Sequence, residues 1–121
     1  MYTDFTQMPV WKNAMDIAVG VYHLSESLPK KEDYALTSQI RRSAESISAN
    51  ISEGFGRGGD KEKIMFYRFS RGSANETKNH LIYGNLVKYF EDGDSAKLVS
   101  KIEALVYELN KIIKTLKSKG S

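Results

Sequence analysis

The chain has 121 residues, of which 18 are Lys or Arg and 15 are Asp or Glu, so its formal net charge is +3 and its pI is near 9.0. It contains no cysteine, which excludes a disulfide scaffold, a thiolate nucleophile and a cysteine-based metal site. It has no apolar run long enough to span a bilayer, and its first residues do not resemble a secretion signal. We therefore expect a cytoplasmic protein with no membrane partner, folded as a single domain over residues 1–121.

Apolar residues recur at helical spacing in the first half of the chain, in two segments separated by a polar corner. The first segment starts at Pro9, which suits a first helical turn, and stops at Pro29. In the second segment the apolar residues step by four, four, three and four: Leu36, Ile40, Ala44, Ile47 and Ile51. Gly54 then suits a C-terminal cap. These patterns predict helices over residues 9–28 and 34–53.

The second half of the chain predicts two longer helices. Asp60 is a suitable N-cap, and no proline follows it before the acidic corner at residues 91–94. The apolar residues of the last segment alternate steps of four and three: Leu98, Ile102, Leu105, Leu109, Ile112 and Leu116. We predict helices over residues 60–90 and 95–118, joined by short connections that favour antiparallel neighbours. The predicted fold class is all-α, an antiparallel up-down-up-down four-helix bundle.

No pattern of residues predicts an active site. A di-metal carboxylate site in a bundle needs Glu-x-x-His pairs, whereas Glu76 and His80 are four residues apart and cannot close a metal site alone. His23 is the only other histidine, and it has no nucleophile beside it in the sequence. The glycine-rich loop at residues 55–59 lacks the ending of a P-loop and follows a helix. We expect a protein that is not an enzyme, with no catalytic residue, metal or cofactor.

Two stripes of residues on the second and third predicted helices do not fit a simple bundle core. The second helix has polar residues spaced by three and four, away from its apolar face: Gln39, Arg42, Ser46, Asn50 and Glu53. The third has a mostly aromatic series at the same spacing: Phe66, Phe69, Ser73, Glu76, His80, Tyr83, Val87 and Phe90. The polar stripe suits either a solvated face or a contact surface. The apolar run at residues 64–67 covers more of its helix than one core can accept, which favours self-association.

The two stripes predict a specific ion pair. A turn at residues 56–59 would place Arg42 roughly level with Gly72, and Gln39 roughly level with Glu76. Because a buried carboxylate needs a partner, we predict that Arg42 pairs with Glu76, within one subunit or between two. The predicted polar network or subunit interface contains seven residues: Gln39, Arg42, Asn50, Glu53, Arg71, Ser73 and Glu76.

Basic residues give a candidate nucleic-acid interface. The last eleven residues hold Lys111, Lys114, Lys117 and Lys119 and no acidic side chain. These cations either complement the dipole of a solvated helix end or contact phosphates. The predicted nucleic-acid-binding residues come from four parts of the chain: Arg41, Arg57, Lys61, Lys63, Arg68, Lys111, Lys114 and Lys117.

Three stretches of sequence resemble the signature of the 23S rRNA intervening-sequence proteins. They are residues 36–43 (LTSQIRRS), 46–54 (SISANISEG) and 71–76 (RGSANE). Trp11, Pro29 and Glu32 also stand where that pattern has them, so the resemblance covers nearly the whole chain in order. Ser43 and Ser48 depart from it, since the family often has Ala and Pro there.

The resemblance implies a four-helix bundle that assembles into a ring-like homo-oligomer, a pentamer in some relatives, without established enzymatic activity. A related branch resembles accessory proteins that bind reverse transcriptase and nucleic acid in diversity-generating retroelements. Two functions follow as expectations. The first is an oligomeric scaffold that binds RNA or DNA, and the alternative is an adaptor that docks a partner protein such as a reverse transcriptase.

Overall fold

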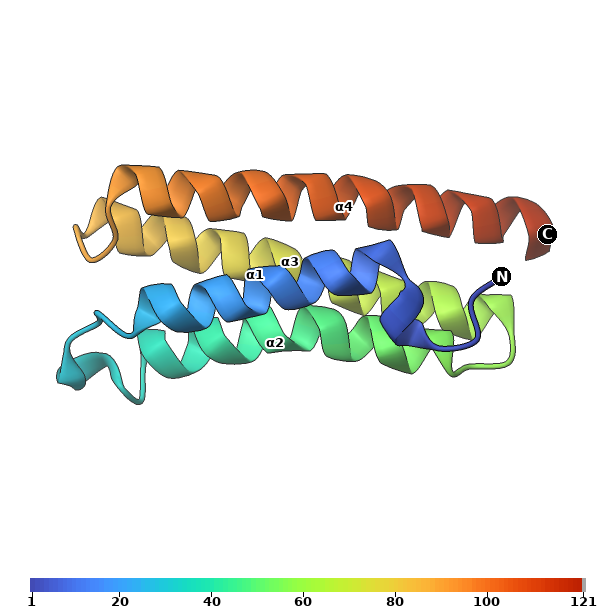
Figure 1. Ribbon diagram of the computed structural model, residues 1–121, viewed down its shortest axis with the longest axis horizontal. Helices are drawn as coiled ribbons and strands as arrows, with labels where there is room; N and C mark the ends of the chain where they lie inside the picture. The colour runs from blue at the N-terminus through green and yellow to red at the C-terminus, as the bar shows by residue number, and fades with distance from the viewer. Residues whose placement is uncertain (121) are drawn as a thin grey trace.

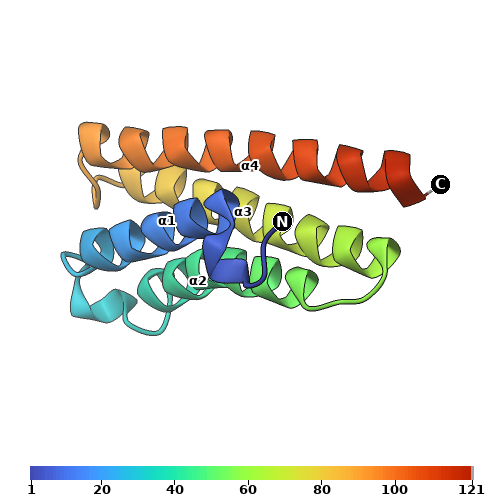
Figure 2. The same cartoon turned by 45° about the vertical axis from the view of Figure 1, so that its right-hand side comes forward.

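The computed structural model describes residues 1–120 and has four long helices, α1 (Pro9–Ser25), α2 (Leu36–Phe55), α3 (Asp60–Leu86) and α4 (Asp92–Gly120). Two 3₁₀ turns, η1 (Phe5–Gln7) and η2 (Lys30–Glu32), precede α1 and α2. Successive helices run antiparallel and pack on one another, as Figures 1 and 2 show. The predicted all-α four-helix bundle is therefore confirmed.

The first and last helices also lie side by side, which closes the bundle. Two polar contacts join α1 to α4, between residues that are 95 and 85 positions apart in the sequence. Asn13 donates a hydrogen bond to Glu108 at 2.8 Å, and Lys101 forms an ion pair with Asp16 at 2.8 Å. Each helix therefore has two neighbours, and the core lies between all four.

Helix α1 ends at Ser25, three residues before its predicted end, because side chains satisfy the carbonyls of its last turn. The Ser25 hydroxyl donates to the Tyr22 carbonyl at 2.9 Å. Arg41 reaches across from α2 and donates to the Ser25 hydroxyl at 2.7 Å and to the Tyr22 carbonyl at 3.4 Å. Helix α2 begins at Leu36 and continues to Phe55, two residues beyond its predicted end.

Helix α3 ends at Leu86, four residues before its predicted end, in a Schellman motif. Lys88 takes the left-handed conformation with φ of 71°, and its N–H donates to the Asn85 carbonyl at 3.0 Å. The N–H of Tyr89 donates to the Gly84 carbonyl at 2.8 Å. This turn folds Phe90 back over Gly84, where an added Cβ would lie 2.3 Å from the ring. Phe90 is therefore buried without belonging to the helix.

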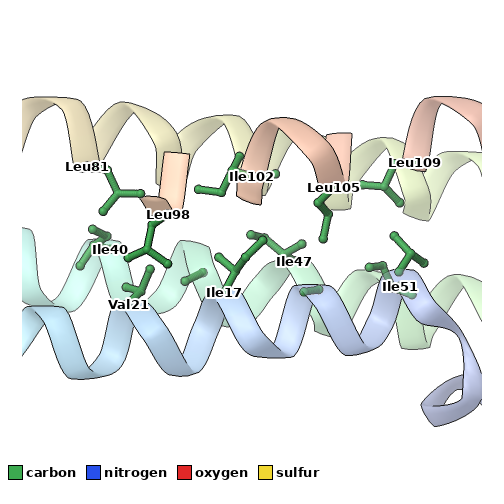
Figure 3. Close-up of a cluster of buried hydrophobic side chains, with 14 of the residues drawn as sticks. Ile17, Val21, Ile40, Ile47, Ile51, Leu81, Leu98, Ile102, Leu105 and Leu109 are labelled. Atoms are coloured by element: carbon green, nitrogen blue, oxygen red, sulfur yellow. The ribbon is translucent and has the colours of Figure 1, made fainter. Parts of the chain in front are cut away.

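The core is a column of aliphatic side chains between the helices, as Figure 3 shows. The residues labelled there are almost completely buried and come from all four helices: Ile17, Val21, Ile40, Ile47, Ile51, Leu81, Leu98, Ile102, Leu105 and Leu109. Helix α3 contributes smaller or more polar groups than the others, and its buried residues are Tyr67, Ser70, Ala74, Thr77, Leu81 and Gly84. The aliphatic stripes of α2 and α4 therefore face a helix that offers few aliphatic side chains.

Small hydroxyl side chains join α2 to α3. Three hydrogen bonds cross this contact: Ser70 Oγ to the Ile47 carbonyl (2.8 Å), Thr77 Oγ1 to Ser43 Oγ (2.8 Å) and Ser73 Oγ to Ser46 Oγ (3.1 Å). We call the five hydroxyl residues the hydroxyl seam. At one end of it, Gly54 lies so near the Tyr67 ring that an added Cβ would be 2.8 Å from Cε1. Small residues therefore let the two helices approach closely.

The hydroxyl seam also sets the register of α2 against α3. Ser43 lies opposite Thr77, so the expectation that Arg42 lies level with Gly72 is wrong by more than one helical turn. The cause is the connection at residues 56–59, which does not fold straight back. Figure 1 shows that it continues past the end of α2, so α3 begins beyond that end.

Replacing Ser70 by Val tests the hydroxyl seam. The added methyl groups have no room at this fully buried position, and the hydrogen bond to Ile47 is lost. We expect Ser70→Val to lower the free energy of unfolding by about 1–3 kcal/mol in urea denaturation. The exposed Ser100→Val on α4 is the control, with a loss below about 0.7 kcal/mol. Equal losses for both variants would contradict close packing at the seam.

Candidate nucleic-acid interface and subunit interface

Basic residues from two distant segments meet at one end of the bundle. Figures 1 and 2 show the C-terminal part of α4 at the same end as the connection between α2 and α3. The start of α3 carries Lys61, Arg68 and Arg71, and the end of α4 carries Lys111, Lys114 and Lys117. The antiparallel topology therefore brings the two predicted patches together.

Two contacts between α3 and α4 place these cations on neighbouring helix faces. Arg71 donates to Asn110 Oδ1 at 2.8 Å, and further along Lys78 forms an ion pair with Glu103 at 2.9 Å. Lys114 and Lys117 follow Asn110 by four and seven residues, so they lie on the side of α4 that faces α3. Arg68 precedes Arg71 by three residues and reaches the level of Lys114.

We call these six residues the basic strip: Lys61, Arg68, Arg71, Lys111, Lys114 and Lys117. Within residues 1–120, no carboxylate lies within ion-pair distance of any of these six side chains. Two acids of α4 near the strip are directed elsewhere, since Glu108 accepts a hydrogen bond from Asn13 on α1 and Glu103 pairs with Lys78. Two further acids, Asp60 and Glu62, flank Lys61 in the first turn of α3. The strip therefore presents a net positive charge to solvent, with its acidic neighbours confined to the end at Lys61.

Three other predicted cations have structural partners. Arg41 caps the last turn of α1, and its guanidinium also lies 4.4 Å from the centre of the Tyr22 ring. Lys63 Nζ donates to the carbonyls of Gly54 and Phe55 at 3.3 and 2.8 Å, which satisfies the C-terminal end of α2. Arg57 pairs with Glu53 at 2.8 Å and covers the ring of Phe66.

We leave these three residues out of the candidate interface. Lys119 is exposed beyond the strip, at the end of α4.

The outward side of α3 and its C-cap carry large apolar side chains that the rest of residues 1–120 leave exposed. These exposed residues are Met65, Phe69, Tyr83, Leu86 and Val87, and we call them the outer apolar face. Phe69 is 51% exposed although it is a full aromatic ring. Beside this face, Gln39 on α2 and His80 and Tyr83 on α3 line a groove of about 490 Å³. The aromatic series of α3 therefore points largely to solvent and not into the core.

Arg42 and Glu76 do not pair within the chain. The Glu76 side chain is 57% exposed, so it is not the buried carboxylate that was expected, and it accepts from His80 Nε2 at 3.3 Å. Arg42 is exposed, and it has no ion pair or side-chain hydrogen bond in the described part of the chain. The alternative of a pair inside one subunit is wrong, because both side chains face solvent and Glu76 contacts His80 instead.

The other predicted network residues divide among separate contacts. Asn50 donates to the Ser46 carbonyl at 2.9 Å, and Ser73 meets Ser46 across the hydroxyl seam. Glu53 pairs with Arg57, and Arg71 contacts α4 and not α2.

The sequence prediction missed three residues whose hydroxyl groups form hydrogen bonds between α2 and α3: Ser43, Ser70 and Thr77. Their helical spacing with Ser46 and Ser73 was the available signal.

Two tyrosines have shifted acidities with structural causes. Burial raises the pKa of Tyr67, which packs against Gly54. The hydrogen bond to Glu32, at 2.8 Å, raises the pKa of Tyr89, and desolvation adds to it. Neither tyrosine belongs to the basic strip.

Other kinds of site find little support in the described residues. No three His, Asp or Glu side chains there lie close enough together to hold a metal ion. Within the same residues, no helix is both long and apolar enough to cross a membrane.

The fold and these surfaces define the class as a small antiparallel four-helix bundle. The chain belongs to the 23S rRNA-intervening sequence protein family, whose sequence pattern matches residues 6–111. The resemblance in the three signature stretches is thereby confirmed.

A solved structure shares this fold. It is the crystal structure of a protein of unknown function from the S23 ribosomal protein family of Bacteroides thetaiotaomicron VPI-5482. The two are similar with a TM-score of 0.81 and 24% sequence identity, over 87% of this chain and 98% of that chain. At this identity the similarity shows the fold alone. No match to a curated protein was found.

Replacing Lys63 by Ala tests whether this cation is structural. The change removes the charged donor from two carbonyls at the end of α2, so we expect the free energy of unfolding to fall by about 0.5–1.5 kcal/mol. Lys61→Ala, an exposed change two residues earlier, should stay within about 0.5 kcal/mol of the wild type. Thermal unfolding of both variants checks this, and an unchanged Lys63→Ala would show that the cap contributes nothing.

Proposed function

We propose that this protein is a non-catalytic, homo-oligomeric scaffold that binds RNA or DNA in the cytoplasm. The basic strip is the observation that carries the proposal. Two segments about fifty residues apart in sequence contribute to it, and the neighbouring α4 acids Glu103 and Glu108 are engaged by other residues. Arg71 bonds to Asn110 and keeps part of its guanidinium for a phosphate. A row of unpaired cations on two adjacent helices suits a nucleic-acid backbone.

Assembly would make a modest basic patch effective. Six cations per copy give weak binding alone, because each phosphate contact is screened by salt. Several copies on one nucleic acid raise the effective concentration of every further patch, so weak contacts combine into useful affinity. The family resemblance, which implies a ring-like assembly, supports the same arrangement.

Neutralising two residues of the basic strip tests nucleic-acid binding. We expect the double variant Lys111→Gln, Lys114→Gln to bind more weakly than the wild type in titrations with structured RNA and duplex DNA. Each lost phosphate contact should lower the slope of log affinity against log salt by about 0.7–0.9. Lys30→Gln, Lys31→Gln at the opposite end is the charge-matched control. Absence of wild-type binding at about 50 mM salt would contradict the proposed function.

The outer apolar face supports self-association. A second copy that covers it would bury Phe69, Leu86 and their neighbours, at a gain of roughly 25 cal/mol for each Å² of apolar surface. The polar stripe of α2 borders this face, so Arg42 of one copy can pair with Glu76 of the next. A rim of paired charges around an apolar centre is typical of protein interfaces.

Introducing a charge into the outer apolar face tests assembly. We expect the wild type to have the mass of several copies in light scattering, five being the number that the resemblance implies for some relatives. Phe69→Glu should shift the protein towards monomer, because a buried carboxylate without a partner costs several kcal/mol. Val19→Glu, a similarly exposed apolar position on α1, should leave the mass unchanged.

Light scattering also tests the proposed ion pair between Arg42 of one copy and Glu76 of the next. Arg42→Glu should weaken assembly, and adding Glu76→Arg should restore it by reversing both charges. A monomeric wild type at high concentration would contradict self-association. The outer apolar face would then be free for a different protein, as the alternative adaptor function requires.

A further inference from the structure

Tyr107 is an exposed aromatic residue within the basic strip. Its side chain is 65% exposed on α4, and Lys111 Nζ lies 5.5 Å from the centre of its ring. Tyr107 precedes Asn110 by three residues and Lys111 by four, so it lies on the side of α4 where Asn110 meets Arg71. The ring therefore stands next to Lys111, on the side of α4 that Arg71 of α3 contacts.

The two acidic side chains near Tyr107 on α4 already have partners, and α3 offers an open position beside Arg71. On α3, Gly72 follows Arg71, and a Cβ added there would meet nothing within 4 Å. Glu103, one turn before Tyr107, is paired with Lys78, and Glu108 is bonded to Asn13 on the α1 side. Within the described residues Tyr107 makes no side-chain hydrogen bond, so a flat group that stacks on the ring displaces at most the Lys111 ammonium that lies over one of its faces.

We infer that the basic strip binds single-stranded nucleic acid, with Tyr107 as the platform on which an unpaired base stacks. This inference rests on the proposed function and names its ligand. Cations that follow the backbone, combined with an exposed aromatic ring, are the arrangement that binds single strands without sequence preference. In a duplex the base faces are already stacked on one another, so a tyrosine on a helix surface gains nothing from them.

The dimensions of the strip agree with this ligand. From Tyr107 to Lys117 is ten residues of α helix, about 15 Å. This length corresponds to about four stacked nucleotides at 3.4 Å each. A base on Tyr107 would leave the following phosphates beside Lys111, Lys114 and Lys117. A 12-nucleotide oligomer is therefore long enough to cover the strip with free ends.

Fluorescence anisotropy with labelled 12-mers of uridine and of thymidine, and with a 12-base-pair duplex, tests the inference. We expect Tyr107→Ala to weaken single-strand binding roughly 5- to 100-fold and duplex binding less than about 2-fold. Tyr107→Phe should retain single-strand affinity, because stacking needs the ring and not the hydroxyl. Tyr34→Ala is the matched control, since Tyr34 is 99% exposed near the opposite end. Circular dichroism of each variant confirms folding.

The outcomes separate this inference from the proposed function. If Tyr107→Ala changes single-strand binding by less than 2-fold, or weakens duplex binding equally, the stacking role is overturned. Salt-dependent binding that requires Lys111 and Lys114 would then still support the scaffold. If the wild type binds none of the three short probes at about 50 mM salt, this inference is overturned. The scaffold is overturned as well only if the longer structured RNA and duplex DNA, which several copies can bind together, also fail to bind.

Discussion

The close approach of α2 and α3 is the constraint on which the surfaces of this bundle depend. The small Ser and Thr residues of the hydroxyl seam, with Gly54 at its end, let the two helices lie close together. The hydroxyl groups form hydrogen bonds to one another or to a backbone carbonyl. Side chains this small leave no space between the helices for the large residues of α3. Phe69, Tyr83 and Leu86 are consequently on the outer side. The same seam thus holds the core together and creates the outer apolar face.

The helices could be predicted from sequence because their apolar residues repeat at the helical period. The aliphatic stripes of α2 and α4 are buried as their spacing requires, and the glycine-rich connection does separate α2 from α3. The acidic corner differs from the prediction, because residues 92–94 form the first turn of α4. The end of α3 could not be predicted in this way. Lys88 takes the left-handed position that usually belongs to glycine, so the sequence has no visible stop signal there.

The candidate site was less predictable, because side-chain partners depend on how the helices are set against one another. The register of α2 against α3 differs by just over one turn from the predicted one, and Glu76 is exposed and contacts His80 instead of Arg42. Basic residues near helix ends were equally ambiguous. Lys63 caps α2, whereas Lys61, two residues earlier, faces solvent. Both are lysines in one helical turn, and composition alone cannot distinguish them.

The contact between α1 and α4 has a consequence for the order of folding. Every other helix pair is joined by a short connection, so its contacts form after the closure of a small loop. Asn13 and Glu108 are 95 residues apart, and their contact must wait for the largest loop closure in the chain. We expect the α2–α3 hairpin to form early and the α1–α4 contact to form last. The same contact would open first when the protein begins to unfold.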